Sequence, residues 1–229
     1  MALGGFDAAW LGAHWVGCEL EAKFVRLGKE NIAAWKARYG HVAGYGRARL
    51  IQGDSRRLTE VVGEAAGLCV SSPPFEEAPT GGGIAKVGHS TDPAMKDRQY
   101  TPNNQGVTSG NLASGSDFWS AAATIVQQVY AVLAPGSHAI FVVKGFIRKR
   151  AYVDFPDQWR RLCESVGFLT LHLHRAWLVE RGNTQPNMLG EPTIDYTRER
   201  KSFFRRLAEK KGSPRIDYEV VLCIERLRV

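Results

Sequence analysis

The residues best suited to chemistry are the four of the tetrapeptide Ser72-Pro73-Pro74-Phe75, which directly follows an apolar segment. Two consecutive prolines fix the backbone and remove two N–H donors, so the carbonyl of Pro73 points outward without a partner in its own chain. Ser72 adds a hydroxyl and Phe75 an aromatic face. A rigid carbonyl, a polar acceptor and a ring suit an exocyclic amino group on a flat, stacked base, whose lone pair the acceptors can direct toward an electrophile.

Two acidic residues occupy comparable places earlier in the chain. Glu19 ends the apolar segment 14–19, and Asp54 follows the segment 48–53. An acid at the end of a sheet's second strand can accept hydrogen bonds from a ribose, as in dinucleotide-binding folds. Asp54, one strand later, can accept from an adenine amino group. Acids that solvate a turn and a strand-ending Pro-Pro turn are the ordinary alternatives, but the order of the three features on successive strands favours a site.

The elements that must position these residues follow a regular alternation. Helices are predicted at 22–39, 118–133 (closed by Pro135-Gly136) and 156–166 (stopped at Gly167), and short buried parallel strands at 14–19, 48–53, 67–71 and 138–144. Segments 168–180 and 218–226 alternate in polarity and predict an antiparallel pair near the end of the chain. Strands that alternate with helices predict an α/β fold with a mostly parallel sheet covered by helices on both faces.

Two segments depart from this alternation. Residues 76–117 are rich in Gly, Ser, Asn, Thr and Pro, and residues 181–196 form a second irregular stretch. A loop as long as the first is usually functional or disordered in a compact domain. If the two segments follow the carboxyl ends of strands, they lie over the edge at which open α/β folds bind ligands. We expect one domain over residues 1–229.

Basic residues concentrate in two places. Between residues 197 and 215 eight cations stand against two acids, which accounts for nearly all of the net charge of +7. The second cluster, Arg148-Lys149-Arg150, directly follows an apolar strand. Local basic density suits a polyphosphate partner, because each neutralised phosphate releases counterions. A solvated helix face is the alternative, so the charge favours nucleic acid as a partner without establishing it.

The composition excludes several classes of protein. With 229 residues, 44% of them hydrophobic, the chain can bury a sizeable core and is not mostly disordered. It has no run of about 18 apolar residues that would span a membrane, and its start lacks the pattern of a secretory signal. Four scattered cysteines without a CxxC pair predict reduced, buried thiols in a cytoplasmic protein and no metal site. His172 and His174 favour an exposed sheet face over a metal site, because no third ligand is in sight.

Taken together, these motifs resemble the amino-group DNA methyltransferases, which use S-adenosylmethionine to methylate N4 of cytosine or N6 of adenine. The catalytic motif of that family is (Asp/Asn/Ser)-Pro-Pro-(Tyr/Phe/Trp), and residues 72–75 match it. Residues 142–168 and 199–222 are also similar to phage-like members, so the resemblance covers most of the chain. It implies a Rossmann-like methyltransferase fold and an enzyme of the kind found in restriction–modification systems.

The resemblance also implies residue roles. Ser72 and the Pro73 carbonyl would hold the amine, Phe75 would stack on a base flipped from double-stranded DNA, and no metal is required. The implied cofactor-binding residues are Gly4, Gly5, Glu19 (ribose), Asp54 (adenine) and Ser55. The two basic clusters supply the expected DNA-binding residues, which are Arg148, Lys149, Arg150, Arg198, Arg200, Lys201, Arg205 and Arg206, with 198–211 as a basic helix. Segments 76–117 and 181–215 would carry target recognition, and serine at the first motif position favours N4 of cytosine over N6 of adenine.

One departure from the family concerns its cofactor loop. In the family a central strand followed by Asp/Asn-Pro-Phe-x-Gly-x-Gly precedes the ribose-binding strand, and this chain begins just after it. Residues 1–5 look like the tail of that loop, and residues 6–11 like the start of the following helix. We expect six of the family's seven strands, with a truncated start or a strand supplied in trans. A catalytically silent DNA-binding relative and a methyltransferase acting on RNA or on a protein amide are the alternatives.

Overall fold

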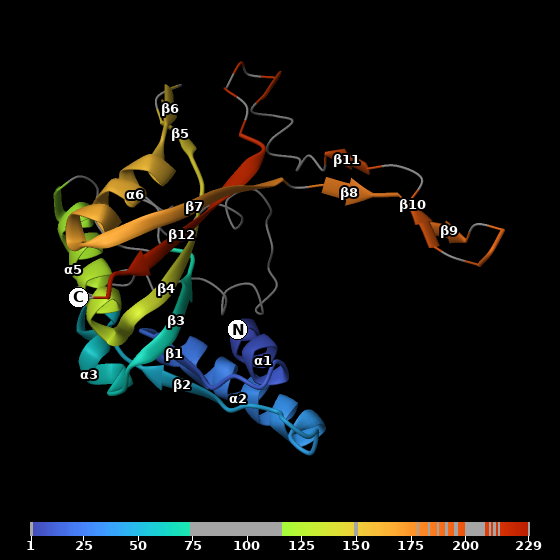
Figure 1. Ribbon diagram of the computed structural model, residues 1–229, viewed down its shortest axis with the longest axis horizontal. Helices are drawn as coiled ribbons and strands as arrows, with labels where there is room; N and C mark the ends of the chain where they lie inside the picture. The colour runs from blue at the N-terminus through green and yellow to red at the C-terminus, as the bar shows by residue number, and fades with distance from the viewer. Residues whose placement is uncertain are drawn as a thin grey trace, which may run out of the picture. The chain divides into compact units, whose positions relative to one another are not determined.

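The structure is a computed structural model, shown in Figure 1. It describes residues 2–73, 116–148, 151–177, 179–182, 184–186, 188–190, 192–194, 197–199, 209–210, 212, 214 and 216–228. Outside the described residues lie most of segment 76–117 and the predicted site residues Pro74, Phe75, Lys149, Arg150, Arg200, Lys201, Arg205 and Arg206. No helix among the described residues is long and apolar enough to cross a membrane.

The chain divides into two compact units. The first comprises Met1–Cys69, Pro73–Ser137 and Arg226–Val229, and the second comprises Val70–Ser72 and His138–Glu225. Strands β3 (Ala66–Ser71) and β4 (Leu133–Val143) each begin in the first unit and end in the second. The single domain expected from the sequence stays a prediction.

The first unit contains a two-stranded parallel sheet. β1 (Trp15–Glu19) pairs with β2 (Ala48–Gln52) in a register that runs from Trp15↔Ala48 to Glu19↔Gln52. α2 (Ala22–Tyr39) connects the two strands and has the bounds that the sequence predicts. It packs closely on β2, because a Cβ atom on Gly28 would lie 2.4 Å from Cδ2 of Leu50. Because β1 and β2 are parallel and in register, their carboxyl ends lie at the same edge of the sheet.

Four further helices are described in the first unit. They are α1 (Leu3–Trp10), the short 3₁₀ helix η1 (Ser55–Arg57), α3 (Leu58–Val62) and α5 (Ser116–Val132). α3 and α5 are joined where the backbone N–H and the hydroxyl of Thr59 both donate to Oε1 of Gln128, at 3.0 and 2.9 Å. The guanidinium of Arg226 donates to the carbonyls of Tyr130 and Ala131, at 2.9 and 3.2 Å, and also to that of Leu133. These bonds satisfy carbonyls at the end of α5 that have no partner within the helix.

A four-stranded sheet has the order β3-β4-β12-β7. β12 (Tyr218–Arg226) is antiparallel to β4, with Leu222 opposite Phe141. β7 (Phe168–Trp177) lies beside β12 and runs in the opposite direction (Figure 1). This confirms that the two segments pair near the end of the chain, and the bounds of β12 are those predicted.

The core of the second unit lies between this sheet and α6 (Phe155–Val166). Phe141 and Leu222 are buried, and the Trp159 ring meets the Phe141 ring edge-on with centroids 5.6 Å apart. The side chain of Asp154 caps the start of α6 by accepting from the N–H of Asp157. The helix stops at Gly167, whose φ of 115° favours glycine.

Several short strands extend the second unit. β5 (Phe146–Arg148) pairs with β6 (Ala151–Val153), β8 (Val179–Arg181) with β11 (Thr197–Glu199), and β9 (Thr184–Pro186) with β10 (Pro192–Ile194). The segment 181–196, expected to be irregular, is therefore partly paired in antiparallel ladders. Arg198 lies in β11 and not in a helix, because its backbone is paired with Glu180.

The α/β class is confirmed, with three differences from the expected sheet. The six longer strands form two sheets where we expected one, because no described strand pairs with β1 on one side and β3 on the other. Pro135 and Gly136 do not close the preceding helix in a loop but lie within β4. β3 was expected to be buried, yet Leu68 and Val70 are 54% and 65% exposed.

Candidate functional site

Glu19 and Asp54 lie at the same edge of the parallel sheet. Glu19 is the last residue of β1, and its carbonyl accepts a hydrogen bond from the N–H of Gly53, 3.0 Å away, so that Asp54 follows directly. Parallel strands present their carboxyl ends together, and ligands of open α/β folds bind at this edge. The structure therefore places both acids that the sequence singles out at one edge of the sheet.

The Asp54 carboxylate is held by its own turn. It caps η1 by accepting from the N–H of Arg56 at 2.9 Å, and it binds the Arg56 guanidinium, with its Oδ2 2.6 Å from Nη2. Partial burial opposes its ionisation, but the hydrogen bonds and charge of Arg56 outweigh burial and lower the pKa of Asp54 below its ordinary value. Asp54 is therefore an anionic acceptor whose direction is set before any ligand arrives.

Arg56 is a residue that sequence reasoning missed. It lies two positions after Asp54, on the first turn of η1, and both carboxylate oxygens of Asp54 accept from it. Arg56 makes four contacts with this carboxylate, two at each oxygen, so a further donor would have to share an oxygen with Arg56. The spacing Asp-x-Arg at the start of a turn is the signal that could have found it, because an N-cap side chain faces the residues that follow it.

Glu19 is held differently. Its Oε1 accepts from the backbone N–H of Glu21 at 3.0 Å, which orients the carboxylate across the turn after β1. Among the described residues no hydrogen bond is formed to its Oε2. Glu21, which is buried, pairs instead with the ammonium of Lys23 at 3.4 Å. Glu19 thus keeps one oxygen able to accept from a pair of hydroxyl groups.

Ser55 lies beside the same edge, where its hydroxyl is 3.9 Å from Sγ of Cys18. Burial raises the pKa of the Cys18 thiol, and Asp54 and Glu19 raise it further, against the lowering effect of Ser55. The Cys18 thiol is therefore uncharged at neutral pH and adds no charge to the edge that carries Glu19 and Asp54. All four cysteines are free, as the sequence predicts, although of the four only Cys163 is fully buried.

Gly4 and Gly5 do not form a loop. Both lie in α1, which begins at Leu3, three residues before the expected helix start. Gly5 is buried, and a Cβ atom at this position would lie 2.7 Å from the Trp15 ring. The close approach of α1 to β1 explains this glycine by packing, and a role for the two glycines in cofactor binding stays a prediction.

Ser72 and Pro73 follow β3, as predicted. The Ser72 hydroxyl is exposed and donates to the carbonyl of Val142, 3.1 Å away, within the second unit. Because its proton is used in that bond, the Ser72 oxygen presents only acceptor lone pairs to a further partner. Pro73 is buried, and Pro74, which follows it, provides no N–H. The Ser72 oxygen and the Pro73 carbonyl are therefore acceptors, and neither proline has an N–H group to donate.

Of the predicted DNA-binding residues, two are described. Arg148 ends β5, and its guanidinium lies 5.1 Å from the centroid of the Phe146 ring. Arg198 is in β11. A cation stacked on an aromatic ring is held in a preferred direction, so Arg148 has a restrained position at the end of β5.

His172 and His174 lie on the exposed part of β7, as expected, with ring centroids 5.7 Å apart. No group of three or more metal-ligating side chains occurs among the described residues.

Comparisons with known proteins bear on the fold. No family model and no curated protein matches the chain. Among solved structures, a SAM-dependent methyltransferase from Methanosarcina mazei matches with a TM-score of 0.52 and 10% identity, over 97% of this chain and 86% of that chain. A methyltransferase from Pyrococcus furiosus matches with a TM-score of 0.48 and 9% identity, over 100% of this chain and 71% of that chain.

A third structure is a candidate DNA modification methylase from Thermus thermophilus. It matches with a TM-score of 0.40 and 16% identity, over 77% of this chain and 53% of that chain. Of these three structures, the Methanosarcina protein supports the fold assignment, because its TM-score is above 0.5. The chain has the Rossmann-like fold of SAM-dependent methyltransferases.

Proposed function

We propose that the chain is an S-adenosylmethionine-dependent DNA methyltransferase that acts on an exocyclic amino group of a flipped base. The observation that carries this proposal is the order of Glu19, Asp54 and Ser72-Pro73-Pro74-Phe75 after three successive strands of a methyltransferase-like fold. N4 of cytosine is favoured over N6 of adenine, because the first motif residue is serine. The cytoplasm is the proposed location and double-stranded DNA the proposed substrate.

Glu19, at the end of β1, and Asp54, just after β2, fit the cofactor. Glu19 keeps Oε2 for the ribose hydroxyls, and the adenine amino group would share an Asp54 oxygen with Arg56. Ser55 contributes its hydroxyl beside them. Gly4 and Gly5 lie in α1, which corresponds to the helix that follows the cofactor loop in the family. S-adenosylmethionine supplies an electrophilic methyl group on a sulfonium when it is bound.

Ser72 and Pro73 fit the target amine. The two N–H groups of the amine donate to the Ser72 oxygen and the Pro73 carbonyl, which leaves the nitrogen lone pair directed away from both acceptors. Positive charge that develops on the nitrogen strengthens both hydrogen bonds, so the acceptors stabilise the transition state more than the ground state. Phe75 stacks on the base and compensates for the stacking lost when the base leaves the duplex.

The basic residues Arg148, Lys149, Arg150, Arg198, Arg200, Lys201, Arg205 and Arg206 are proposed to contact phosphates. Such contacts fix the position of the duplex without reading its sequence. Recognition of a target is proposed for segments 76–117 and 181–215.

The test is to incubate the chain with mixed-sequence duplex DNA and S-adenosylmethionine, digest the DNA, and measure methylated nucleosides by mass spectrometry. N4-methylcytosine is the expected product. Ser72→Ala should lower the rate about 10- to 100-fold, the range for losing a hydrogen bond to a charged group. Ser71→Ala is the matched control, because Ser71 is the exposed neighbour and has no assigned role.

The alternatives give different results in the same assay. A silent relative would form no methylated nucleoside yet would retain salt-sensitive DNA binding. Faster methylation of RNA or of a protein amide in competition with DNA would show that DNA is not the preferred substrate. Equal loss of rate in Ser71→Ala and Ser72→Ala would remove Ser72 from the proposed site.

A further inference from the structure

The outer edge of β2 carries backbone groups that no described strand pairs with. In a parallel pair, alternate residues of a strand bond to the same neighbour. The carbonyl of Arg47 accepts from the N–H of Trp15 at 2.7 Å, and the N–H of Gly53 donates to Glu19 at 3.0 Å, so the odd-numbered residues of β2 face β1. The N–H and C=O groups of Ala48, Leu50 and Gln52 therefore face away from β1.

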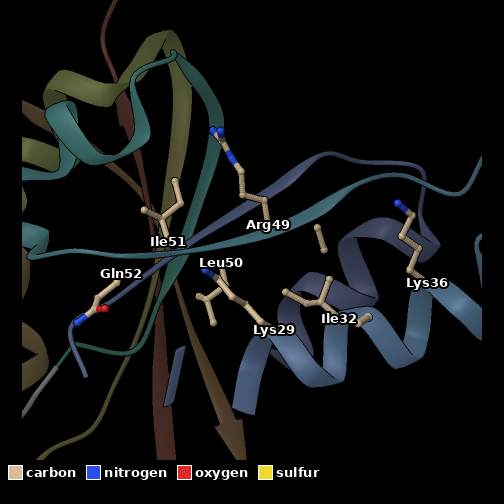
Figure 2. Close-up of a pocket in the computed structure, with 9 residues that line it drawn as sticks. Lys29, Ile32, Lys36, Arg49, Leu50, Ile51 and Gln52 are labelled. Carbon is tan, nitrogen blue, oxygen red and sulfur yellow. The ribbon is translucent and has the colours of Figure 1, made fainter. Parts of the chain in front are cut away.

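A groove runs along this edge between β2 and α2. It has a volume of about 530 Å³ and is lined by residues of both elements. Figure 2 shows Lys29, Ile32 and Lys36 projecting from α2 on the side of the strand, with Arg49 and Ile51 on the other face of β2. An apolar floor beside a row of outward-facing backbone groups is the arrangement that accepts an added β-strand.

The charge of the groove selects the strand it can accept. Arg49 is paired with Glu64 at 2.7 Å, but Lys29 and Lys36 are exposed and form no ion pair with a described residue. A second copy of the chain paired through the same edge would bring these lysines face to face with their equivalents, and like charges across an interface are unfavourable. Phosphates would be attracted to the lysines, but a phosphate cannot pack on the apolar floor, and it cannot donate a backbone N–H to the carbonyl groups of the strand edge.

We propose that the outer edge of β2 binds an extended, acidic segment of a partner protein as an additional strand. The backbone of the segment would bond to Ala48, Leu50 and Gln52, its apolar side chains would contact Ile32 and Ile51, and its acidic side chains would pair with Lys29 and Lys36. This site is separate from the residues assigned to methyl transfer.

The probe is a fluorescent, end-blocked peptide of alternating glutamate and valine, about seven residues long, near the usual length of a strand. Its binding to the full chain is measured by anisotropy, and the exchange of backbone amides by mass spectrometry and NMR. The amides of Ala48, Leu50 and Gln52 should exchange at least about 10-fold more slowly with the peptide bound, whereas those of Arg49 and Ile51 should change little because they already face β1. A peptide with N-methyl groups on alternate residues should not bind.

Charge reversal tests the selection. K29E/K36E should weaken binding of the peptide about 10-fold or more, since two rim charge pairs are replaced by repulsion. R38E/R228E is the control, because both arginines are exposed, neither lines the groove, and the net charge changes equally. Equal weakening in both variants would show attraction to the net charge alone and overturn the site.

Three other outcomes would also overturn the proposal. One is protection of Ala48, Leu50 and Gln52 by concentrating the chain alone, with dimers in sedimentation, which would make the occupant a second copy. Another is protection by a short DNA duplex and none by the peptide, which would make it nucleic acid. The last is absence of protection by the peptide at saturating concentration. Methyl transfer does not enter these measurements, so their failure is separate from failure of the proposed function.

Discussion

β3 and β4 are neighbouring strands with similar apolar sequences and opposite environments. In β4, Ala139, Phe141 and Val143 are each at most 2% exposed, whereas Leu68 and Val70 of β3 are more than half exposed. The difference follows from position in the sheet. β4 lies between β3 and β12 and is covered by Trp159 of α6, whereas β3 is an edge strand of the sheet that the described residues form.

This comparison shows that an apolar strand is not always a buried one. Burial of a strand needs a neighbour on each edge and a covering layer on each face, and composition reports only the capacity to be buried. β7, at the opposite end of the same sheet, shows the same effect along most of its length. The two ends are exposed for one reason, although their sequences differ.

The largest effect should come from removing the core ring of β4. Phe141→Ala should lower the free energy of unfolding by about 3–5 kcal/mol, because it leaves a cavity against Trp159 and Leu222. Leu68→Ala on β3 should cost less than about 1 kcal/mol, since an exposed side chain loses little packing. Urea unfolding of both variants measures the difference. Similar losses in the two variants would mean that β3 is as well covered as β4.

A smaller effect should come from Arg226, whose guanidinium holds the carbonyls at the junction of α5 and β4. Arg226→Ala should cost about 2 kcal/mol, because charged hydrogen bonds to partly buried carbonyls are lost. Arg228→Ala is the matched control, two residues further on and exposed. Thermal unfolding of the two variants is the measurement, and a loss in the control as large as in Arg226→Ala would contradict the role in capping.

The smallest effect tests the other face of β3. Burial raises the pKa of the Cys69 thiol to about 11, so the unfolded chain loses this proton at lower pH than the folded one. A raised thiol pKa means that stability is lost as the pH rises above the ordinary value of 9.0. Between about pH 9 and 10, Cys69 should contribute about 1 kcal/mol to this loss.

Two variants of β3 separate the contribution of Cys69 to the pH dependence of the unfolding free energy. Cys69→Ala should flatten the fall in unfolding free energy between about pH 9 and 10, whereas Val70→Ala, on the open face, should keep the wild-type slope. Urea unfolding at several alkaline pH values provides the data. A wild-type slope in Cys69→Ala would show that both faces of β3 are open to solvent.

Local patterns predicted much of the fold. The helix at Ala22–Tyr39 and the strand at Tyr218–Arg226 have the bounds expected from periodicity, and α6 stops at Gly167 because glycine adopts the left-handed conformation there. Glu19 and Asp54 meet at one edge because parallel strands joined by a helix must end together. These features depend on neighbours in the chain or on a single crossover.

The remaining features depend on partners far apart in the sequence. The division of the strands into two sheets, the exposure of Leu68 and Val70, and the bond from Arg226 to the end of α5 all join segments that no local pattern connects. The bond from Ser72 to Val142 is of the same kind. The sequence alone determined which residues can accept hydrogen bonds and where β1, β3 and β12 end. Only the tertiary structure decided which acceptors stay available and which strands are covered, because both depend on what packs beside them.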